Sequence, residues 1–512
     1  MSVRVRFAPS PTGPLHIGGV RTALYNYLFA RKNNGTFILR IEDTDQSRYI
    51  SGAEEYIIES LAWMNLTPDE GPGFGGDFGP YRQSERRDLY TKHIGELINN
   101  ETAYFAFDTP GELEAMREKM RAEGVHSPKY DHSMRMRMRN SITMSADEVK
   151  SLLDAGTPHT IRLKVPVNEK VVFQDNVRGE ISINTNELDD KVLMKADGLP
   201  TYHLANVIDD HLMKITHVIR GEEWLPSTAH HVLLYRAFNW TETMPEFAHL
   251  PLILKPTGKG KLSKRDGAKF GFPVFPLKWP DREGDFDGFR EFGFLPEAML
   301  NFLAFLGWNP GTDQEIFSKE ELIMAFSIEH IIKSGARFDY DKALWFNGQH
   351  ILAIDGKKLN GIVSGILEEN GYHPSEDFVD QFVALYKDRM KVLGGFVQSA
   401  AIYLAVLTQF EESFVRKKWN SELNQHFRTM RVRLTSLESF DTESIQDVIK
   451  PYIQDNALNF GVVFQLMRTA LSGSPKGPDL FAMMQLMGKE EVLSRLLSAL
   501  DIFDVIQTKQ NG

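Results

Sequence analysis

A histidine beside two glycines near the amino terminus is suited to binding phosphate. His16-Ile17-Gly18-Gly19 combines an imidazole with residues whose lack of a side chain lets a nucleotide approach the backbone. At the start of a helix, the exposed N–H groups and the helix dipole would favour phosphate, and the imidazole could donate to a phosphate oxygen. We therefore predict an anion-binding site here, with a purely structural hydrogen bond of His16 as the alternative.

A basic, glycine-containing stretch lies about 240 residues further along the chain. Lys255–Lys269 contains six basic residues, one acidic residue and three glycines. A flexible basic loop can close over phosphates, where Lys261 and especially Lys264 would stabilise charge that grows in a phosphoryl-type transition state. The alternative is a solvated surface loop.

Acidic residues form the third notable group. Glu42-Asp43-Thr44-Asp45 follows an apolar run, and Asp209-Asp210 lies in the middle of the chain. These aspartates could be read as metal ligands, but we expect them to cap turns and form salt bridges. The sequence predicts no protein-bound metal site.

The first and third of these groups lie in a predicted βαβ unit. Val3–Phe7 alternates like a short strand, Gly19–Asn33 has apolar residues at helical spacing, and Phe37–Ile41 reads as a second strand. Ligands bind at the carboxyl ends of such parallel strands. The histidine-glycine and acidic segments should therefore meet at one edge of a sheet.

The composition is that of a folded protein with several domains. The chain has 512 residues, 42% of them hydrophobic and 25% charged, and a net charge of -11. This charge argues against coating DNA or anionic membranes, so nucleic-acid contacts must be local. The absence of cysteine excludes disulfides, thiolate nucleophiles and thiolate metal sites. No secretion signal or membrane-spanning stretch stands out, and we expect a cytoplasmic protein without membrane or DNA partners.

Longer motifs around these segments resemble class I glutamyl-tRNA synthetases. Ala8–Gly19 followed by Arg40–Asp45 is similar to the start of that family, and Lys261–Ala268 looks like its KMSKS loop in the glutamate-family form. Thr201–His211 and Val218–Trp224 match the second half of its nucleotide-binding domain. One position departs from the first signature, because Gly19 replaces its final histidine, as is common in this branch.

The resemblance implies roles for particular residues. The two signatures consist of Pro9, Ser10, Pro11, Thr12, Gly13, Pro14, Leu15, His16, Ile17, Gly18 and Gly19, and of Lys261, Leu262, Ser263, Lys264 and Arg265. His16, Lys261 and Lys264 would be catalytic. Glutamate would contact Arg6, Ala8, Ser10, Glu42, Tyr202, Asn206 and Arg220. ATP would contact Pro9, Ser10, His16, Gly18, Gly19 and Lys264.

The implied reaction joins glutamate to tRNA(Glu). Glutamate and ATP would give glutamyl-adenylate and pyrophosphate, with Mg²⁺ arriving on the ATP phosphates. A ribose hydroxyl of the terminal adenosine would then accept the glutamyl group. An arginine can grip the side-chain carboxylate and Glu42 can pair with the α-ammonium group, which would select glutamate over glutamine. The family expectation is a monomer that usually needs tRNA for efficient activation.

The fold implied is a Rossmann-like α/β class I catalytic domain with an inserted α+β acceptor-binding domain, followed by an all-α anticodon-binding region. The expected boundaries are 1–102 and 196–255 for the catalytic halves, 103–195 for the acceptor-stem insertion, 256–335 for the lysine-loop and stem-contact subdomain, and 336–512 for the helical end. In the subdomain after the lysine loop, Phe294–Leu306 and Ser318–Phe326 read as helices.

The insertion has two notable features. Gly111–Glu123 reads as a charged helix, and alternating Met and Arg over 134–139 predicts a strand with one basic face, or a plain solvated edge strand. Some family members bind zinc here through cysteines, at positions that hold Ala106, Asp108, Tyr130 and Met134 in this chain. His126, Asp131 and His132 lack a zinc spacing, so we expect no zinc.

The last third reads as helical, with Gly356 and Gly371 as helix stops. Two basic segments, Arg416–Trp419 and Phe427–Arg433, could meet an anticodon by phosphate pairing and base stacking. For any one of their residues, a solvated helix face is the favoured interpretation.

Three rivals remain open. A glutaminyl-tRNA synthetase would share the active site but carry a β-barrel anticodon region. A tRNA-modification enzyme built on the same core would lack the last third. A catalytically dead RNA-binding paralogue would be expected to lose His16, Glu42 or Lys264, all of which are present.

Overall fold

The computed structural model describes residues 2–280 and 285–508. The chain divides into two compact units. Unit 1 comprises Met1–Glu291 and Pro296–Phe346, and unit 2 comprises Phe292–Leu295 and Asn347–Gly512.

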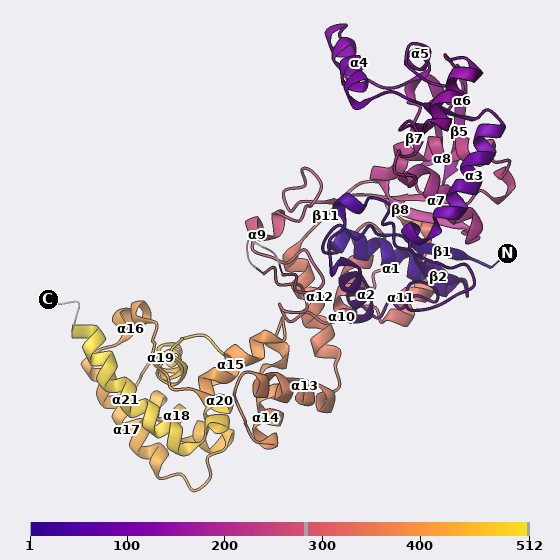
Figure 1. Ribbon diagram of the computed structural model, residues 1–512. Helices are drawn as coiled ribbons and strands as arrows, with labels where there is room; N and C mark the ends of the chain where they lie inside the picture. The colour runs from indigo at the N-terminus through magenta and orange to yellow at the C-terminus, as the bar shows by residue number, and fades with distance from the viewer. Residues whose placement is uncertain (1, 281–284, 509–512) are drawn as a thin grey trace. The chain divides into compact units, whose positions relative to one another are not determined.

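Unit 1 begins with the predicted βαβ motif (Figure 1). Strand β1 (Arg4–Phe7) pairs in parallel with β2 (Thr36–Leu39), and helix α1 (Ile17–Lys32) connects them. Helix α1 starts two residues before the predicted Gly19, because the His16 side chain accepts a hydrogen bond from the Gly18 N–H and caps the helix.

A second parallel set of strands completes the nucleotide fold. Strand β8 (His217–Gly221) pairs in parallel with β9 (Glu246–Leu250). Strand β9 also pairs in parallel with the last residue of β5 (Lys170–Asp175). Strand β5 forms an antiparallel hairpin with β6 (Gly179–Asn184). The Thr216 N–H donates to the Arg4 carbonyl at 2.9 Å and so joins this set to β1. The carboxyl ends of β1, β2, β8 and β9 therefore point to a common edge.

Helices cover these strands and extend the unit. They are α2 (Ala53–Trp63), α3 (Arg87–Asn99), α7 (Tyr202–Leu212), α8 (Leu225–Ala237), α9 (Asp266–Phe270), α10 (Pro296–Ala304) and α11 (Lys319–Ala325). The helices predicted at Phe294–Leu306 and Ser318–Phe326 are confirmed in this set, and Ser318 and Glu321 form a capping box at the start of α11. A short parallel pair, β10 (Ile253–Leu254) with β11 (Ala336–Arg337), lies beside the lysine loop, Lys261–Arg265.

The insertion is an α+β structure, as predicted. Its antiparallel strands are β3 (Ala103–Ala106), β4 (Thr160–Leu163) and β7 (Val192–Met194), and its helices are α4 (Pro110–Ala122), α5 (His132–Arg135) and α6 (Ala146–Asp154). Helix α4 confirms the helix predicted at Gly111–Glu123.

The strand predicted over residues 134–139 is wrong. The carboxylate of Asp131 accepts hydrogen bonds from the N–H groups of Ser133 and Met134, which starts helix α5, and turns follow it. Met134 packs in an apolar cluster, and Arg135 is buried with its Nε 3.2 Å from an Asp190 carboxylate oxygen. The predicted basic face therefore does not form, because one of its arginines is neutralised inside the protein.

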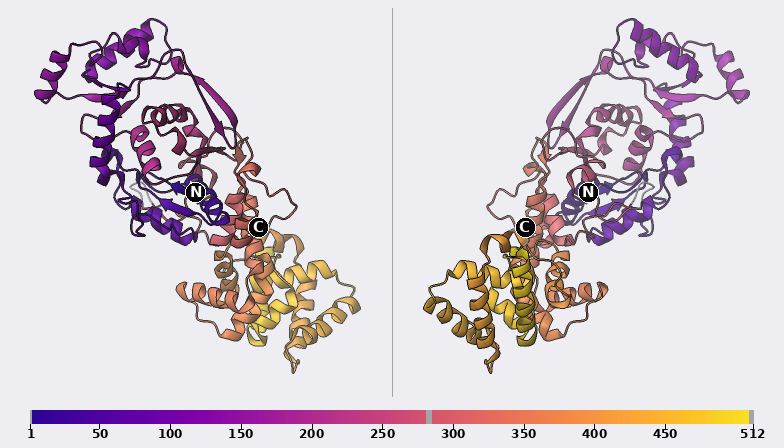
Figure 2. Two further views of the ribbon diagram at one scale, coloured as in Figure 1. Left: turned by 90° about the vertical axis from the view of Figure 1, so that its right-hand side faces the viewer. Right: turned by 90° about the vertical axis from the view of Figure 1, so that its left-hand side faces the viewer.

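Unit 2 is built from helices, which Figure 2 shows in orange to yellow. They are α13 (Gly356–Glu369), α14 (Glu376–Tyr386), α15 (Gly394–Leu404), α16 (Glu412–Lys418), α17 (Ser421–Thr435), α18 (Thr442–Asp455), α19 (Phe460–Ser472), α20 (Leu480–Met487) and α21 (Lys489–Thr508), with α12 (Tyr340–Ala353) leading into them. Gly371 follows α13 as predicted, whereas Gly356 begins that helix instead of ending one, because Asp355 caps the helix there. Among the described residues 338–508 none is in a strand, so the helical end is confirmed except at the start of the predicted region 336–512, where Ala336–Arg337 form strand β11.

Candidate active site

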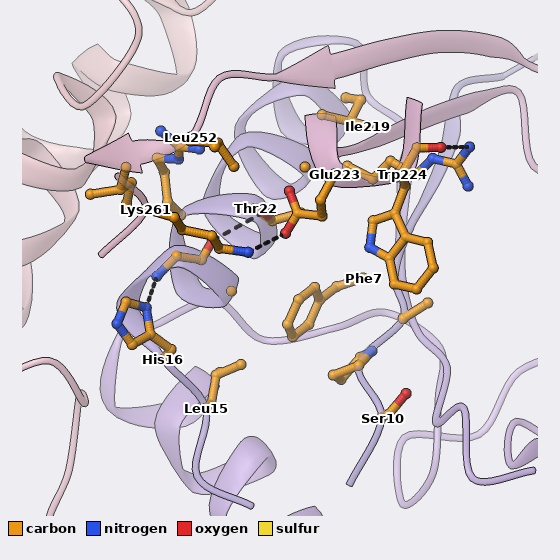
Figure 3. A pocket seen from close by; sticks show the side chains of 18 of the residues that line it. Phe7, Ser10, Leu15, His16, Thr22, Ile219, Glu223, Trp224, Leu252 and Lys261 are labelled. Carbon is orange, nitrogen blue, oxygen red and sulfur yellow. Dashed lines mark hydrogen bonds and ion pairs between the residues drawn. The ribbon is translucent and has the colours of Figure 1, made fainter. Parts of the chain in front are cut away.

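A pocket of about 550 Å³ opens at the carboxyl ends of the parallel strands (Figure 3). Its walls include Ala8 to Ser10 after β1, Glu42 after β2, Glu223 and Trp224 after β8, and Pro251 to Ile253 after β9. This is the position at which α/β sheets bind their ligands.

The two sequence signatures share this pocket although they lie far apart in the chain. Ser10, His16, Gly18 and Gly19 line it from the first signature, and Lys261–Lys264 line it from the lysine loop. The ammonium group of Lys264 comes so close to Gly13 that a Cβ at this position, where φ is +129°, would lie 3.1 Å from Lys264 Nζ. Glycine at position 13 therefore leaves room for the lysine beside the first signature.

His16 presents a buried hydrogen-bond donor that has no partner among the described residues. Its Nδ1 accepts from the Gly18 N–H at 3.1 Å, so the proton of the neutral ring is on Nε2. Nε2 is buried and has no hydrogen-bond partner in the described structure. Burial and the nearby Lys264 and Lys261 lower the pKa of His16 to about 4, which keeps the ring neutral at pH 7. A neutral donor of this kind fits a phosphate oxygen.

The backbone N–H groups at the start of α1 are not available as predicted. The Ile17 N–H donates to the Val274 carbonyl, the Gly18 N–H to His16 Nδ1, and the N–H groups of Gly19 and Val20 to the His16 carbonyl. The expected cradle of free amides is therefore wrong, since local turns already satisfy these groups. What remains for an anion is the helix dipole, the glycine surface and His16 Nε2.

The lysine loop is held in place by the buried side chain of Leu262 and by hydrogen bonds from Ser263. The Leu262 side chain is buried, and the N–H and Oγ of Ser263 donate to the Asp266 carboxylate at 2.8 and 2.6 Å. Lys255 Nζ lies 3.0 Å from the other oxygen of Asp266. The hydrogen bond from Ser263 is the main reason that the pKa of Asp266 falls to about 2. These contacts fix the backbone that carries Lys261 and Lys264.

Lys261 is paired with an acidic residue of the pocket wall. Its Nζ lies 2.7 Å from Oε1 of Glu223, which follows β8 (Figure 3). Burial opposes the charge of Glu223, but the bond to Lys261 outweighs it and lowers the pKa of Glu223.

Arg6 is held by a buried carboxylate on helix α7. Its Nε and Nη2 donate to Asp210 at 3.0 and 3.2 Å, and Arg40 Nη1 donates to the same carboxylate at 2.7 Å. Burial would raise the pKa of Asp210, but the two guanidinium groups outweigh it and hold that pKa below its ordinary value. Arg6 lines the pocket, and the edge formed by its two terminal nitrogens is not the edge that faces Asp210.

Glu42 offers a carboxylate to the same pocket. Arg40 Nη2 and Asn206 Nδ2 each donate to its Oε1 at 3.1 Å, so both bonds leave Oε2 unused. Burial raises the pKa of Glu42 although Arg40 and Arg6 oppose this change. A cationic ligand would therefore be favoured beside Glu42.

Arg220 and Tyr202 form the remaining polar wall. Arg220 Nη1 donates to the Tyr202 hydroxyl at 2.7 Å, and Nη2 donates to Thr228 Oγ1 at 2.8 Å. The Tyr202 hydroxyl thus accepts from the arginine and keeps its own proton for a ligand. Its ring packs against Trp224 with the centroids 4.4 Å apart. All seven residues that the sequence places around glutamate line this pocket, although their roles remain predictions.

The aspartates that resemble metal ligands have structural partners. Asp43 accepts from the N–H and Oγ of Ser84, Asp45 from Arg48, and Asp209 from Arg86. These are the caps and salt bridges expected from the sequence. Within the described ranges, no group of three or more histidine, aspartate or glutamate side chains is arranged to hold a metal ion.

The four positions that correspond to zinc ligands make other contacts. The Tyr130 hydroxyl donates to Asp108 at 2.9 Å, and Ala106, Tyr130 and Met134 belong to one apolar cluster. Hydrogen bonding and apolar packing therefore organise this part of the insertion.

Several residues of the pocket wall were not predicted. Thr22, Glu223, Trp224 and Pro251–Ile253 line the pocket without a role assigned from the sequence. Glu223 and Trp224 lie in a stretch that matches the family, and this match was the available signal. Residues 251–253 have no local pattern that could have identified them.

The two aromatic residues considered for anticodon stacking in unit 2 cannot stack on a base. Trp419 and Phe427 are 2% and 1% exposed, and Trp419 Nε1 donates to Asp504 at 2.8 Å. Both belong to the core of the helical unit because they lie on the inward faces of their helices. The Arg428 side chain is half exposed and lies 3.2 Å from Asp501. Base stacking by these aromatic residues is thus excluded.

Known proteins and family models are similar to this chain over nearly its whole length. A family model described as tRNA synthetases class I (E and Q), catalytic domain, matches residues 2–345, and one described as an anticodon binding domain matches residues 358–500. Relatives named glutamate–tRNA ligase from Porphyromonas gingivalis and Flavobacterium johnsoniae are each 50% identical over 98% and 97% of this chain and 99% of their own lengths.

Solved structures give the same result. A crystal structure of a glutamate tRNA ligase from Elizabethkingia meningosepticum in complex with its amino acid has a TM-score of 0.92 and 48% identity, covering 98% of this chain and 99% of that one. The glutamate-tRNA synthetase from Elizabethkingia anophelis has a TM-score of 0.91 and 47% identity, covering 98% and 100%. No helix among the described residues is long and apolar enough to span a bilayer. By its pocket, its fold and its relatives, this chain belongs to the glutamate–tRNA ligase family of class I aminoacyl-tRNA synthetases.

Proposed function

We propose that this pocket forms glutamyl-adenylate from L-glutamate and MgATP and then transfers glutamate to the 3′-terminal adenosine of tRNA(Glu). An oxygen of the glutamate α-carboxylate attacks the α-phosphorus, and the bond from that phosphorus to pyrophosphate breaks. The 2′-hydroxyl of the tRNA then attacks the glutamyl carbonyl carbon, AMP leaves with the bonding electrons, and the hydroxyl proton passes to a phosphate oxygen of the departing AMP. No protein nucleophile takes part.

Positioning and electrostatic stabilisation account for the catalysis. His16 Nε2–H donates to a phosphate oxygen, while Lys264 and Lys261 neutralise the charge that develops on the α-phosphate and pyrophosphate. The ammonium group of Lys261 has three N–H donors and uses one of them for Glu223, so it can also donate to a phosphate oxygen. Alignment of two bound reactants can contribute about 7–11 kcal/mol, which makes positioning a sufficient source of rate.

Glutamate is selected by charge. The side-chain carboxylate of the substrate meets Arg220, the Tyr202 hydroxyl and the terminal edge of Arg6, and its ammonium group meets Glu42. Glutamine would bring the N–H donors of a neutral amide against two guanidinium groups, which can only donate, and against a Tyr202 hydroxyl that already accepts from Arg220. The cost of those mismatched donors disfavours glutamine.

The observation that carries this proposal is the shared pocket of His16 and Lys264, with Arg6, Glu42 and Arg220 in its wall. The pocket is complete within a single chain, which supports action as a monomer. The lack of cysteine suits the cytoplasm. The insertion is proposed to contact the acceptor stem, and unit 2 the anticodon.

The test is pyrophosphate exchange by the purified full chain. Labelled pyrophosphate should enter ATP when glutamate and tRNA(Glu) are both supplied, and glutamine should not replace glutamate. Exchange with glutamine and not glutamate would contradict the proposal.

A charging assay addresses the remaining rival substrate. Glutamate should be attached to tRNA(Glu), and a parallel assay with tRNA(Gln) shows whether that tRNA is also accepted. Failure to charge tRNA(Glu) would exclude the proposed reaction.

A further inference from the structure

Behind the pocket, a line of hydrogen bonds crosses three neighbouring strands and ends at Tyr202. Asp175 is the last residue of β5, His249 lies on β9, and Arg220 lies on β8 in direct parallel register with His249. Asp175 Oδ2 is 2.6 Å from His249 Nδ1, His249 Nε2 is 3.1 Å from Arg220 Nε, and Arg220 Nη1 is 2.7 Å from the Tyr202 hydroxyl. Asp175, His249 and Arg220 are 2%, 0% and 5% exposed.

The direction of each bond in this line follows from the chemistry of arginine. A guanidinium group can only donate, so His249 Nε2 must accept from Arg220. The proton of the neutral ring is then on Nδ1, and it is donated to Asp175. Thr228 supports this arrangement, because its Oγ1 accepts from Arg220 Nη2 at 2.8 Å and lies 3.2 Å from His249 Nε2.

We propose that Asp175 and His249 are positioning residues for glutamate recognition: Asp175 fixes the tautomer of His249, and His249 holds the Arg220 guanidinium in its orientation toward the substrate carboxylate. This inference rests on the proposed function, in which Arg220 binds the side chain of glutamate. Neither Asp175 nor His249 lines the pocket, so both act through Arg220.

The surroundings of Asp175 determine what an amide would do there. Its Oδ1 accepts from the N–H groups of Val177 and Arg178 at 3.0 and 2.8 Å, and Oδ2 faces His249. In Asp175→Asn the remaining carbonyl oxygen stays with these two backbone donors, which turns the NH₂ group toward His249 Nδ1. The ring must then carry its proton on Nε2, where it opposes the N–H of Arg220.

Two substitutions of His249 separate positioning from packing. The side-chain amide of glutamine lies about as far from the backbone as imidazole Nε2, so His249→Gln keeps a hydrogen-bond acceptor for Arg220. Asparagine reaches only as far as Nδ1, so His249→Asn keeps a donor for Asp175 and loses that acceptor. Both variants replace the same buried ring by an amide.

The experiment measures KM for glutamate and for ATP in pyrophosphate exchange with tRNA supplied. Asp175→Asn and His249→Asn should raise the glutamate KM about tenfold or more, with the ATP KM changed less than about twofold. His249→Gln should stay within about threefold of wild type. Asp190→Asn is the matched control, because Asp190 is a buried aspartate outside the pocket, and its glutamate KM should not change.

A pH profile gives a readout that a packing role would not move. Among the described residues, the charged groups facing His249 are Asp175 at the end of β5, Arg178 after that strand and Arg220 on β8. Burial lowers the pKa of His249 although Asp175 opposes this, so the ring is neutral at pH 7 and takes up a proton only on acidification. The wild-type glutamate KM should therefore rise more steeply below pH 6 than that of His249→Gln, in which the group cannot titrate.

The outcomes are distinguishable. Three results would each overturn the positioning role. The first is an equal glutamate KM for His249→Gln and His249→Asn, and the second is a parallel change in the KM for glutamate and the KM for ATP. The third is a glutamate KM of Asp175→Asn that equals that of Asp190→Asn. Wild-type protein without glutamate-dependent exchange would overturn the proposed function and this inference with it. Normal wild-type exchange combined with unchanged Asp175→Asn constants would overturn the inference alone.

Discussion

The two units of the molecule treat charge in opposite ways. Unit 1 buries ionised side chains in linked sets, among them Arg6 with Arg40 and Asp210. Unit 2 packs its helices around an apolar core, and in the part of it that the structure describes Arg495 is the one charged side chain that is buried. The basic residues considered for RNA contact, such as Arg428, remain near its surface.

This difference follows from the ligands that each unit is proposed to bind. Selecting a small charged substrate requires oppositely charged groups that are held in place away from water. Each of these groups then needs buried partners, which are the Asp210 carboxylate for Arg6 and neutral acceptors for Arg220. A helical unit that meets RNA phosphates at its surface has no such requirement. We therefore expect buried charge in this protein to mark the unit in which the proposed chemistry occurs.

The largest effect should come from removing a buried counter-charge. Asp210→Ala leaves Arg6 and Arg40 without their shared carboxylate, and breaking such a buried set costs about 3–5 kcal/mol of unfolding free energy. Chemical denaturation measures the loss, and hydrogen exchange should locate it at α7. A loss below about 1 kcal/mol would contradict the view that unit 1 depends on this network.

The next effect concerns catalysis. Lys264→Ala should lower the rate of pyrophosphate exchange about a hundredfold, because a positioned cation that acts on the transition state contributes about 2.7 kcal/mol. Lys259→Ala provides the control, since Lys259 is an exposed lysine near the same loop and does not line the pocket. Its rate should stay within about twofold of wild type. Equal losses in the two variants would reduce the role of Lys264 to general loop charge.

A third prediction concerns the protonation of His16. Burial and the two lysines lower its pKa to about 4 from the usual 6.5, so the ring should remain neutral through pH 6 and bind a proton only near pH 4. Its stabilising contribution in the neutral form is present above pH 6.5 and declines as the pH falls toward 4. A ¹³C NMR titration of the Cε1 resonance measures this, and Lys264→Ala should raise the midpoint. A wild-type midpoint above 6 would contradict the environment described for this ring.

The smallest effect should come from the surface of unit 2. Arg428 lies 3.2 Å from Asp501, and the two side chains are 50% and 73% exposed. Asp501→Ala should change the unfolding free energy by about 0–1 kcal/mol, since exposed ion pairs are screened by water. The same denaturation assay applies, and a loss that approached the effect of Asp210→Ala would remove the contrast between the units.

Local patterns predicted the elements of this fold better than its long-range bonds. The spacing of apolar residues was sufficient for α1 and for the helical character of unit 2, because such a pattern reports directly on one face of a helix. Helix α4 was predicted from its charged sequence. The Met and Arg alternation over 134–139 failed because a single capping carboxylate, Asp131, starts a helical turn that no period can reveal.

The candidate site divides in the same way. Its two signatures were identifiable as motifs, whereas the partner of Arg6 lies 204 residues away and the partner of Asp175 lies 74 residues away. The backbone N–H of Ile17 is bonded to the carbonyl of Val274, which belongs to a distant part of the chain. Such pairings depend on tertiary packing, and a single sequence carries no local trace of them.

The most direct test of the central claim is a crystal structure of the full chain with a non-hydrolysable glutamyl-adenylate analogue. We expect the phosphate group of the analogue to lie within hydrogen-bond distance of both His16 Nε2 and Lys264 Nζ, and its side-chain carboxylate to contact Arg220 and Tyr202. An analogue bound outside this pocket, or one held by His16 with the lysine loop turned away, would contradict the claim that the two signatures act together on one nucleotide.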